Sequence, residues 1–387
     1  MTSFLGTFVY RQLQHLKNRY NIVVLTTHYI PLTKRHVFRQ PRYEFRDGIH
    51  VYSLSSPAYW LFGFGMVHRR LLDFALIDKM LTSRKIAKFA RHLHVKYHFS
   101  LVHGHETYVG DEAARIGQML GIPSIFTLDG IYWYHAKNFG NAALNRAVAN
   151  VNACDRLIAI SRISAESYQS HGVCRVFDII PNGIDPQKPC SQCPKPPDDI
   201  ATFARDKFVL LTVGFFAAEK RIERSIGTLA RLHQDGIRNT VLIIIGKGRL
   251  LPRYRSIIEQ ERLGHAVRIV GELPPQGMSA YYSVTDVLVH PSVVESFSMV
   301  CLEAMSHGKP IICTSNIGLV EYLHPGRDAI VIPPDDPEAL YQAVLGLIQD
   351  PSRRRALGEE ARHTATRLSW SDQVRRIERL YEQVLSE

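Results

Sequence analysis

The chain has 387 residues, of which 45% are hydrophobic and 21% charged, as is typical of a globular protein of two or three domains. Its six cysteines are scattered, and Cys190 and Cys193 form an isolated C-x2-C pair, so we expect neither a disulfide framework nor a zinc site, and a reducing compartment is favoured. The net charge of +11 is concentrated in residues 1–100, which hold 16 Lys and Arg against 4 Asp and Glu, whereas the remainder holds 31 against 32.

Apolar runs of strand length alternate with helical periodicity along the chain. In the first part these runs lie at 21–27, 100–106, 124–129, 156–161 and 176–181, and in the second part at 208–214, 240–246, 267–271, 286–291, 309–314 and 328–334. Between them, the segment from Asn182 to Lys207 is rich in Pro, Cys and Asp and is interpreted as a linker. Strands that alternate with helices indicate parallel sheets covered on both faces.

We therefore predict an α/β protein of two doubly wound, Rossmann-like domains that face a cleft. The first domain is expected at 1–187 and the second at 207–369, with a linker at 188–206. The amphipathic segment 370–387 is expected to pack back on the first domain.

The basic first quarter also contains an aromatic-rich run, AYWLFGFGM. Trp60, Phe62 and Phe64 precede Arg69 and Arg70, a mixture that suits a membrane interface. We expect peripheral association with an anionic membrane surface and no nucleic-acid partner; the alternatives are a solvated basic face and aromatic residues that belong to the core. The run is too short to span a bilayer and no secretory signal is visible, so we expect a cytoplasmic protein at the inner face of the membrane.

Two glutamates stand out in the stretch VVESFSMVCLEAMSHGKP at 293–310. Glu295 follows a predicted strand, and Glu303 lies about a turn and a half into a helix predicted to begin near Ser298. Ligands bind at the carboxyl ends of the strands in such sheets, and a helix N-terminus attracts anions. Two carboxylates that flank a diphosphate-binding turn would suit a nucleotide-sugar, which has hydroxyls at both ends and phosphates in the middle.

At these residues the chain resembles the retaining glycosyltransferases of family 4, which have the GT-B fold. The segment HPSVVESFSMVCLEAMSHGKPII matches their pattern P-S-x-x-E-x-F-x5-E-A-M-x-x-G-x-P. The segments DRLIAISRISAESYQSHGV with IIPNGID, VGFFAAEKRIERSI and LSWSDQVRRIERLYEQVL resemble further family motifs in the same order. The resemblance covers essentially the whole chain.

The resemblance implies a role for each matching residue. Glu295 would hold a hydroxyl of the transferred sugar, Glu303 would hold the ribose, and Lys220 would neutralise the diphosphate leaving group. The catalytic candidates are Glu295, Lys220 and Asp129. The donor-binding candidates are Gly214, Phe215, Lys220, Arg221, Gly246, Gly248, Glu295, Ser296, Phe297, Ser298, Met299, Val300 and Glu303.

Three departures from the family pattern concern the donor and acceptor sides. Phe215 replaces the usual Arg after Gly214, and Arg221 is expected to supply the lost charge. The family's G-F-G is SFS at 296–298. The family's T-x-H-G is TLDG, so Asp129 stands where a histidine is expected. The other acceptor-side candidates are His103, His105 and His135.

The family also begins with a strand and a glycine-rich loop, whereas the segment 6–16 already has the pattern of the first helix. The first strand of the sheet is therefore expected to be missing. We expect a form extended upstream to be more soluble and more active, because neighbouring strands would otherwise expose unpaired edges.

The resulting hypothesis is a retaining hexosyltransferase that uses a nucleotide-diphospho-sugar donor and a lipid-linked or polysaccharide acceptor, as in envelope polysaccharide assembly. No D-x-D motif lies at a strand end, so neither a metal nor another cofactor is expected. Two alternatives remain: a sugar phosphorylase or synthase of the same fold, and a degenerate, non-catalytic nucleotide-sugar-binding protein.

Overall fold

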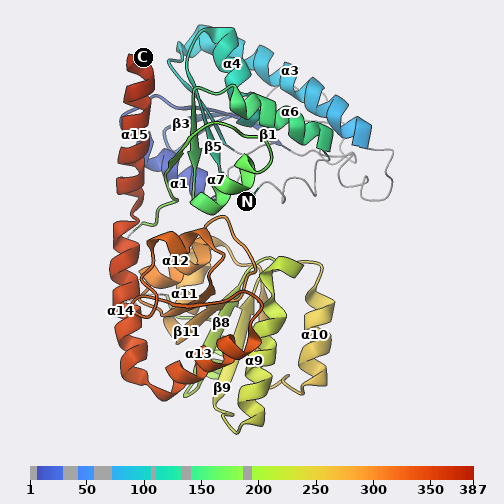
Figure 1. Ribbon diagram of the computed structural model, residues 1–387, viewed down its shortest axis with the longest axis vertical. Helices are drawn as coiled ribbons and strands as arrows, with labels where there is room; N and C mark the ends of the chain where they lie inside the picture. The colour runs from blue at the N-terminus through green and yellow to red at the C-terminus, as the bar shows by residue number, and fades with distance from the viewer. Residues whose placement is uncertain (1–6, 29–41, 56–71, 106–109, 132–140, 186–193) are drawn as a thin grey trace. The chain divides into compact units, whose positions relative to one another are not determined.

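The computed structural model describes residues 7–28, 42–55, 72–105, 110–131, 141–185 and 194–387. The chain forms two compact units. Unit 1 comprises Met1–Gly183 together with Trp370–Glu387, and unit 2 comprises Ile184–Ser369. Both are α/β structures, as the alternating pattern predicts (Figure 1).

Unit 1 contains two sheets among its described residues, with strand orders β1-β3-β2 and β4-β5-β6-β7. Its strands are β1 (Val23–His28), β2 (Arg42–Arg46), β3 (Ile49–Ser55), β4 (Val102–His105), β5 (Ser124–Leu128), β6 (Arg156–Ala159) and β7 (Phe177–Ile179). Its helices are α1 (Thr7–Leu16), α3 (Leu72–Tyr97), η2 (Gly110–Glu112), α4 (Ala113–Leu120), α6 (Asn141–Asn152), α7 (Arg162–Gln169) and α15 (Trp370–Ser386). All pairings are parallel except that of β2 with β3.

Strands β2 and β3 form a hairpin that the sequence analysis missed. The two central turn residues, Asp47 and Gly48, both have positive φ angles, of 51° and 82°. An Asp-Gly pair is a strong hairpin signal, because both positions of this turn type favour residues that tolerate positive φ. The hairpin escaped notice because every residue of β2 is exposed and the strand therefore has no apolar face.

A cavity of about 610 Å³ lies in unit 1 beside strands β1 and β4. Among the described strands, β1 pairs only with β3, and β4 pairs only with β5, so each has one unpaired edge. The cavity is bordered by residues 21–27 and 98–105, and by side chains of α1, α3, α4 and α15. Most of these helical side chains are apolar, so the two sheets are separated by a largely hydrophobic space.

Helix α15 is last in sequence and packs in unit 1. Its apolar face places Trp370, Val374 and Ile377 against Ile125 and Ile158 of the central strands β5 and β6. The side chain of Arg376 adds a hydrogen bond of 2.6 Å to the carbonyl of Ile179. The segment 370–387 is thus part of the core of unit 1 rather than a surface appendage.

Unit 2 is built on one parallel sheet with strand order β10-β9-β8-β11-β12-β13. Its strands are β8 (Phe208–Val213), β9 (Thr240–Ile245), β10 (Val267–Gly271), β11 (Val287–His290), β12 (Ile311–Thr314) and β13 (Ile330–Ile332). Its helices are α8 (Asp198–Ala204), η4 (Ala218–Lys220), α9 (Ile222–Gln234), α10 (Leu251–Gln260), η5 (Pro275–Gly277), α11 (Met278–Val284), α12 (Met299–Ser306), η6 (Gly318–Tyr322), α13 (Pro337–Gln349) and α14 (Pro351–Arg367). Helices cover both faces of this sheet (Figure 1).

The predicted linker at 188–206 needs a correction, because its second half is helical. Residues Asp198–Ala204 form α8, which buries Ile200 and Phe203 in unit 2. The acidic first turn and the following apolar residues explain why the Pro-rich segment gives way to a helix here.

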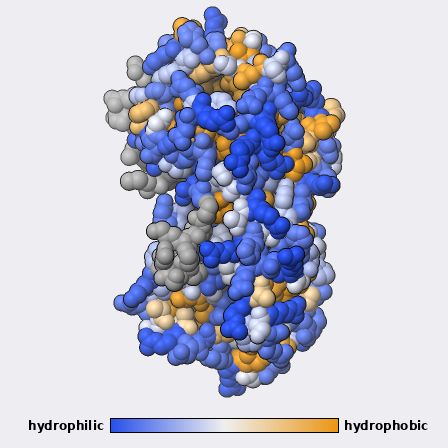
Figure 2. Space-filling model, turned by 90° about the vertical axis from the view of Figure 1, so that its left-hand side faces the viewer, coloured by the Kyte–Doolittle hydropathy of each residue, from blue (hydrophilic) through white to orange (hydrophobic). Residues whose placement is uncertain are grey.

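One side of unit 2 has a mainly polar surface. Figure 2 shows a mainly hydrophilic surface on the side of α14, with apolar residues in separate small patches. Within the described ranges, no helix is both long enough and apolar enough to cross a bilayer.

Candidate active site

Two loops that follow parallel strands are tied together in unit 2. One follows β8 and contains η4, and the other follows β11 and leads into α12. The backbone N–H of Val293 donates to the carbonyl oxygen of Glu219 at 2.8 Å, which brings Lys220 beside the second loop. Both loops lie at the carboxyl ends of their strands, where open α/β sheets bind ligands.

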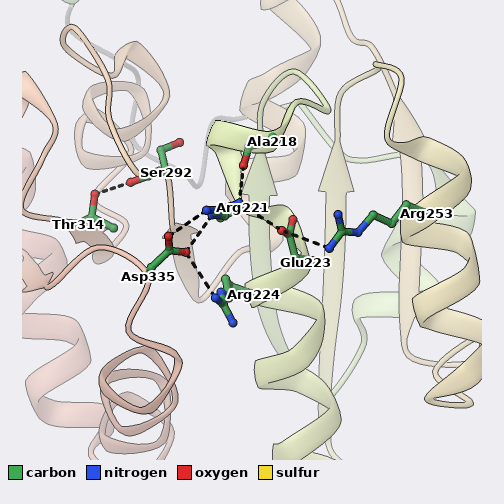
Figure 3. A network of polar contacts seen from close by, with 8 residues as sticks. All are labelled: Ala218, Arg221, Glu223, Arg224, Arg253, Ser292, Thr314 and Asp335. Atoms are coloured by element: carbon green, nitrogen blue, oxygen red, sulfur yellow. Dashed lines mark hydrogen bonds and ion pairs between the residues drawn. The ribbon is translucent and has the colours of Figure 1, made fainter.

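The second loop is also fixed by the segment that follows β12. The N–H of Glu295 donates to the carbonyl of Asn316, and the N–H of Gly318 donates to the carbonyl of Glu295, both at 3.1 Å. Thr314 donates its hydroxyl to the carbonyl of Ser292 at 2.5 Å (Figure 3). The backbone of Glu295 is therefore held from both sides, which limits the positions that its carboxylate can reach.

The side chains around Glu295 converge on one carboxylate oxygen, Oε1. It accepts hydrogen bonds from the ammonium group of Lys220 and from the hydroxyl of Ser292, the latter at 3.1 Å. Nε2 of His290 lies 2.8 Å from the same oxygen. Burial opposes ionisation of Glu295, but His290 and Lys220 outweigh it and hold the pKa of this carboxyl well below its usual range. We call Lys220, His290, Ser292, Glu295 and Ser298 the Glu295 site.

Helix α12 begins beside this carboxylate, as predicted. Ser298 precedes its first residue and has φ 88° and ψ 79°, in the left-handed region. The Ser298 side chain makes no capping hydrogen bond to the helix, and its hydroxyl instead lies 3.2 Å from Nε2 of His290. Phe297 is buried, whereas Ser296, Met299 and Val300 are half-buried. The side chain of Ser298 therefore does not cap the backbone N–H groups in the first turn of α12.

Glu303 lies one turn further along α12 and is held by a residue that sequence reasoning missed. The buried Tyr282 of α11 donates its hydroxyl to Oε2 of Glu303 at 3.1 Å. The ring of Tyr282 lies against that of His307, with centroids 4.8 Å apart. Burial and the neighbouring Glu303 raise the pKa of Tyr282 well above its usual range, so its hydroxyl stays a donor.

The glycines predicted at the donor site allow two loops to approach each other closely. Lys220 lies over Gly214, whose added Cβ would be 3.6 Å from the lysine chain. Gly246 has φ +148°, and a Cβ there would lie 1.9 Å from the carbonyl oxygen of Gly214. A Cβ on Gly248 would lie 2.6 Å from the carbonyl oxygen of Phe216. Phe215 points outward and is 55% exposed.

Arg221 is paired with a carboxylate of unit 2. Its guanidinium donates two hydrogen bonds to Asp335, at 2.8 and 3.0 Å, and Arg224 lies 3.5 Å from the same carboxylate (Figure 3). On the other side, Glu223 lies between Arg221 and Arg253 (Figure 3). Asp335 thus balances the charge of Arg221 in this structure, and the role of Arg221 toward a phosphate stays a prediction.

A second polar cluster lies in unit 1, at the ends of β4 and β5. Nδ1 of His105 lies 3.0 Å from Oδ2 of Asp129. The neighbouring His103 contacts the hydroxyls of Tyr381 and Thr127, at 2.6 and 2.7 Å. Burial, with a smaller contribution from His105, keeps the pKa of His103 well below its usual range, so this ring is neutral. The structure thus brings together three of the predicted acceptor-side residues.

Some predicted residues lie outside the described ranges. These are His135, the aromatic and basic residues of the segment 56–71, and the Cys190 and Cys193 pair. Conversely, His290 and Tyr282 contact predicted site residues but were not singled out. His290 ends a strand that leads directly into the Glu295 loop, and this position is the signal that could have identified it.

Two family models divide the chain between them. Residues 5–188 match the family described as Glycosyltransferase Family 4, and residues 198–364 match the family described as Glycosyl transferases group 1. The chain belongs to the group 1 glycosyltransferases of the family 4 type. This agrees with the resemblance seen in the sequence motifs around the Glu295 site.

This glycosyltransferase has relatives of low sequence identity that match it over most of its length. It is 25% identical over 285 residues to an uncharacterised glycosyltransferase of Methanocaldococcus jannaschii, covering 73% of this chain and 75% of that protein. It is 24% identical over 315 residues to the D-inositol 3-phosphate glycosyltransferase of Corynebacterium kroppenstedtii, covering 75% and 68% of the two chains.

Solved structures agree on the fold. The Anabaena protein HepE in complex with UDP has a TM-score of 0.74 at 17% identity, with 98% of each chain covered. Sucrose-phosphate synthase from Thermosynechococcus elongatus has a TM-score of 0.72 at 21% identity, covering 98% of this chain and 93% of that one. The predicted GT-B fold of this glycosyltransferase is confirmed.

Proposed function

We propose that this glycosyltransferase moves a hexosyl group from a nucleotide-diphospho-sugar to a lipid-linked or polysaccharide acceptor. The transfer would retain the configuration of the sugar and need no metal ion. The observation that carries this proposal is the ion pair of Lys220 and Glu295 beside the uncapped first turn of α12. This arrangement offers positive charge to a diphosphate and a carboxylate to a sugar within one small region. UDP in the HepE structure supports a nucleotide-sugar as the donor.

Charge determines how the donor would sit. The N–H groups of the first turn of α12 and the ammonium of Lys220 attract the diphosphate, which gains negative charge as the sugar leaves. Glu295 remains ionised because its pKa is held low, so it accepts a hydrogen bond from a sugar hydroxyl and stabilises developing positive charge at the anomeric carbon. Glu303, positioned by Tyr282, accepts hydrogen bonds from the ribose hydroxyls.

The bond changes in the transfer balance without a protein nucleophile. The bond between the anomeric carbon and the phosphate oxygen breaks, and the electron pair leaves with the diphosphate. The acceptor hydroxyl attacks from the same face, which retains the configuration, and its proton passes to the diphosphate oxygen that has gained charge. Lys220 stabilises this leaving group electrostatically.

The acceptor would be bound by unit 1. The carboxylate of Asp129, paired with His105, is suited to accept a hydrogen bond from an acceptor hydroxyl. The outer face of α3 supports a membrane-linked acceptor: Leu81 and Val95 are 53% and 71% exposed. The same face carries the exposed basic residues Arg84, Lys85, Lys88, Arg91 and Lys96. Such a mixture of apolar and basic side chains favours an anionic membrane surface.

Thermal-shift screening with UDP, GDP and their sugars tests donor binding. At about a hundred times its Kd, the correct nucleotide should stabilise the protein by about 2.7 kcal/mol. Glu295→Ala should bind that nucleotide yet lose transfer activity by about two orders of magnitude or more. Near-full transfer by Glu295→Ala would overturn the proposal.

Two further measurements distinguish the alternatives. Binding of a nucleotide without any transfer would favour a non-catalytic role, and turnover with phosphate or a free sugar as acceptor would favour a phosphorylase or synthase. Sedimentation with vesicles tests the membrane part of the proposal. Binding should require anionic lipid, and equal binding to neutral and anionic vesicles, or to neither, would rule it out.

A further inference from the structure

His290 occupies a central place in the Glu295 site although it has no part in the proposed bond changes. It is the last residue of β11, and its side chain is only 3% exposed. One atom of its ring, Nε2, lies 2.8 Å from Oε1 of Glu295 and 3.2 Å from the hydroxyl oxygen of Ser298. A single nitrogen on a rigid strand therefore bridges the loop carboxylate and the start of α12.

The chemistry of this contact shows where the proton lies. A bare Nε2 would place its lone pair against a carboxylate oxygen, which is repulsive. The nitrogen therefore carries a hydrogen, which it donates to Glu295 and shares with the hydroxyl oxygen of Ser298. The same N–H group thus holds two site residues at a defined distance from each other.

Ser298 depends on such support for two reasons. Its backbone has φ 88°, a region in which side chains other than glycine are disfavoured. A serine before a helix also usually caps the helix with its own hydroxyl, which would occupy the N–H groups of the first turn. Here that hydroxyl contacts His290 and makes no cap, so those N–H groups stay open to a ligand anion.

We propose that His290 is a positioning residue, which fixes the Glu295 carboxylate and the Ser298 turn relative to each other. This inference rests on the proposed function, because it explains how the residues assigned to the sugar and the diphosphate are held for the reaction. His290 would act through Glu295 and Ser298 and would not itself touch the donor.

Two amide substitutions distinguish the effect of losing the N–H group at the Nε2 position from the effect of losing the imidazole ring. In His290→Gln the side-chain amide nitrogen can reach the place of Nε2, whereas in His290→Asn the shorter amide cannot. We expect His290→Ala and His290→Asn to lower kcat on the order of 10- to 100-fold, as for loss of a hydrogen bond to a charged group. His290→Gln should recover most of that loss. The Kd for the nucleotide should rise in His290→Ala and His290→Asn and recover in His290→Gln, because the turn that presents its N–H groups to the diphosphate loses and regains the same support.

A second arm uses Ser298→Gly, which tolerates the positive φ without support. Combined with His290→Ala, it should cost less than the product of the two single effects, because both substitutions disturb one turn. Strict multiplication of the two effects would overturn the role assigned to the turn, and equal activity of the Asn and Gln variants would overturn the role assigned to Nε2.

Crystal structures of the variants provide a readout that does not depend on turnover. The Glu295 carboxylate should keep its place in His290→Gln and move or lose order in His290→Ala. If the Glu295 carboxylate keeps its place in both His290→Gln and His290→Ala, the inference is wrong, whatever the activity of the variants. If the wild type transfers no sugar, the proposed function fails, but a displaced Glu295 in His290→Ala would still support the positioning role.

Discussion

Nδ1 of His105 lies 3.0 Å from Oδ2 of Asp129, so the ends of β4 and β5 present an imidazole and a carboxylate as one pair. Nδ1 of the ring carries the hydrogen that is donated to the carboxylate, and Nε2 lies 3.5 Å from the side-chain amide nitrogen of Gln12. The other carboxylate oxygen, Oδ1 of Asp129, is buried without a hydrogen-bond partner in the described part of the chain. A polar atom in this state is costly unless a ligand satisfies it.

Substitution of Asp129 should therefore affect the acceptor and not the donor. We expect Asp129→Ala to raise the KM for the acceptor about ten-fold or more, because a hydrogen bond to a charged group is lost. The Kd for the nucleotide should not change, since the Glu295 site belongs to unit 2. Asp178→Ala on the exposed side of β7 is the matched control. An unchanged acceptor KM, or an equal change in the control, would remove Asp129 from the acceptor site.

Lys220 and Arg221 are neighbours in sequence, but we expect their substitutions to affect nucleotide binding differently. Lys220 is paired with Glu295 at the site, whereas the charge of Arg221 is balanced by Asp335. Lys220→Ala should weaken nucleotide binding about ten-fold or more, and Arg221→Ala should have a clearly smaller effect. Isothermal titration with the nucleotide that stabilises the wild type measures both. A larger loss with Arg221→Ala would show that Asp335 releases Arg221 to the phosphates.

The low pKa of Glu295 predicts a pH dependence of stability. The pKa of Glu295 is lower in the folded state than in the unfolded state. The ionised carboxylate therefore stabilises unit 2 at pH values above the ordinary pKa of a glutamate, and this contribution is lost as the pH falls toward the pKa of the folded state. The difference in unfolding free energy between the wild type and Glu295→Gln should shrink between about pH 6 and about pH 3, by up to about 1.4 kcal/mol per pH unit.

Denaturant titrations at several pH values measure this difference. Glu259→Gln, which removes an exposed carboxylate on α10, controls for the loss of one negative charge. A constant difference between wild type and Glu295→Gln over this range would contradict the low pKa.

Gly246 should be far less tolerant of substitution than Gly227. At Gly246 the backbone has φ +148°, and a Cβ would lie 1.9 Å from a carbonyl oxygen, so Gly246→Ala should destabilise unit 2 by about 3 kcal/mol or more. Gly227 lies in α9 with open space around it, so Gly227→Ala should be neutral or stabilise by up to about 1 kcal/mol. Thermal unfolding compares the two, and similar melting temperatures would show that the loops around Gly214 can separate.

The central strands β9, β11 and β12 of unit 2 could be predicted from sequence because every residue in them is buried. Thr240–Ile245 has no exposed position, so its apolar run is unbroken, and the same holds for Val287–His290. The place of Glu295 followed from the rule that loops at the carboxyl ends of such strands bind ligands. Those inferences need only local pattern and topology.

Contacts between distant residues could not be predicted in this way. Arg221 and Asp335 are 114 positions apart, and no local pattern indicates that they pair. Tyr282 reads as an ordinary core aromatic until the fold places its hydroxyl beside Glu303. The strand Arg42–Arg46 escaped because its residues are exposed and carry no alternation. In each case the information lies in tertiary geometry.

The discontinuous composition of unit 1 has a consequence for biosynthesis. Residues 184–369 form unit 2 as one uninterrupted stretch, so this unit can fold as soon as it leaves the ribosome. Unit 1 is begun first but must wait for Trp370, Val374 and Ile377 before Ile125 and Ile158 are covered. During translation of unit 2, helix α15 cannot yet cover that apolar face of β5 and β6. We therefore expect unit 2 to complete its fold before unit 1, although the synthesis of unit 1 begins first.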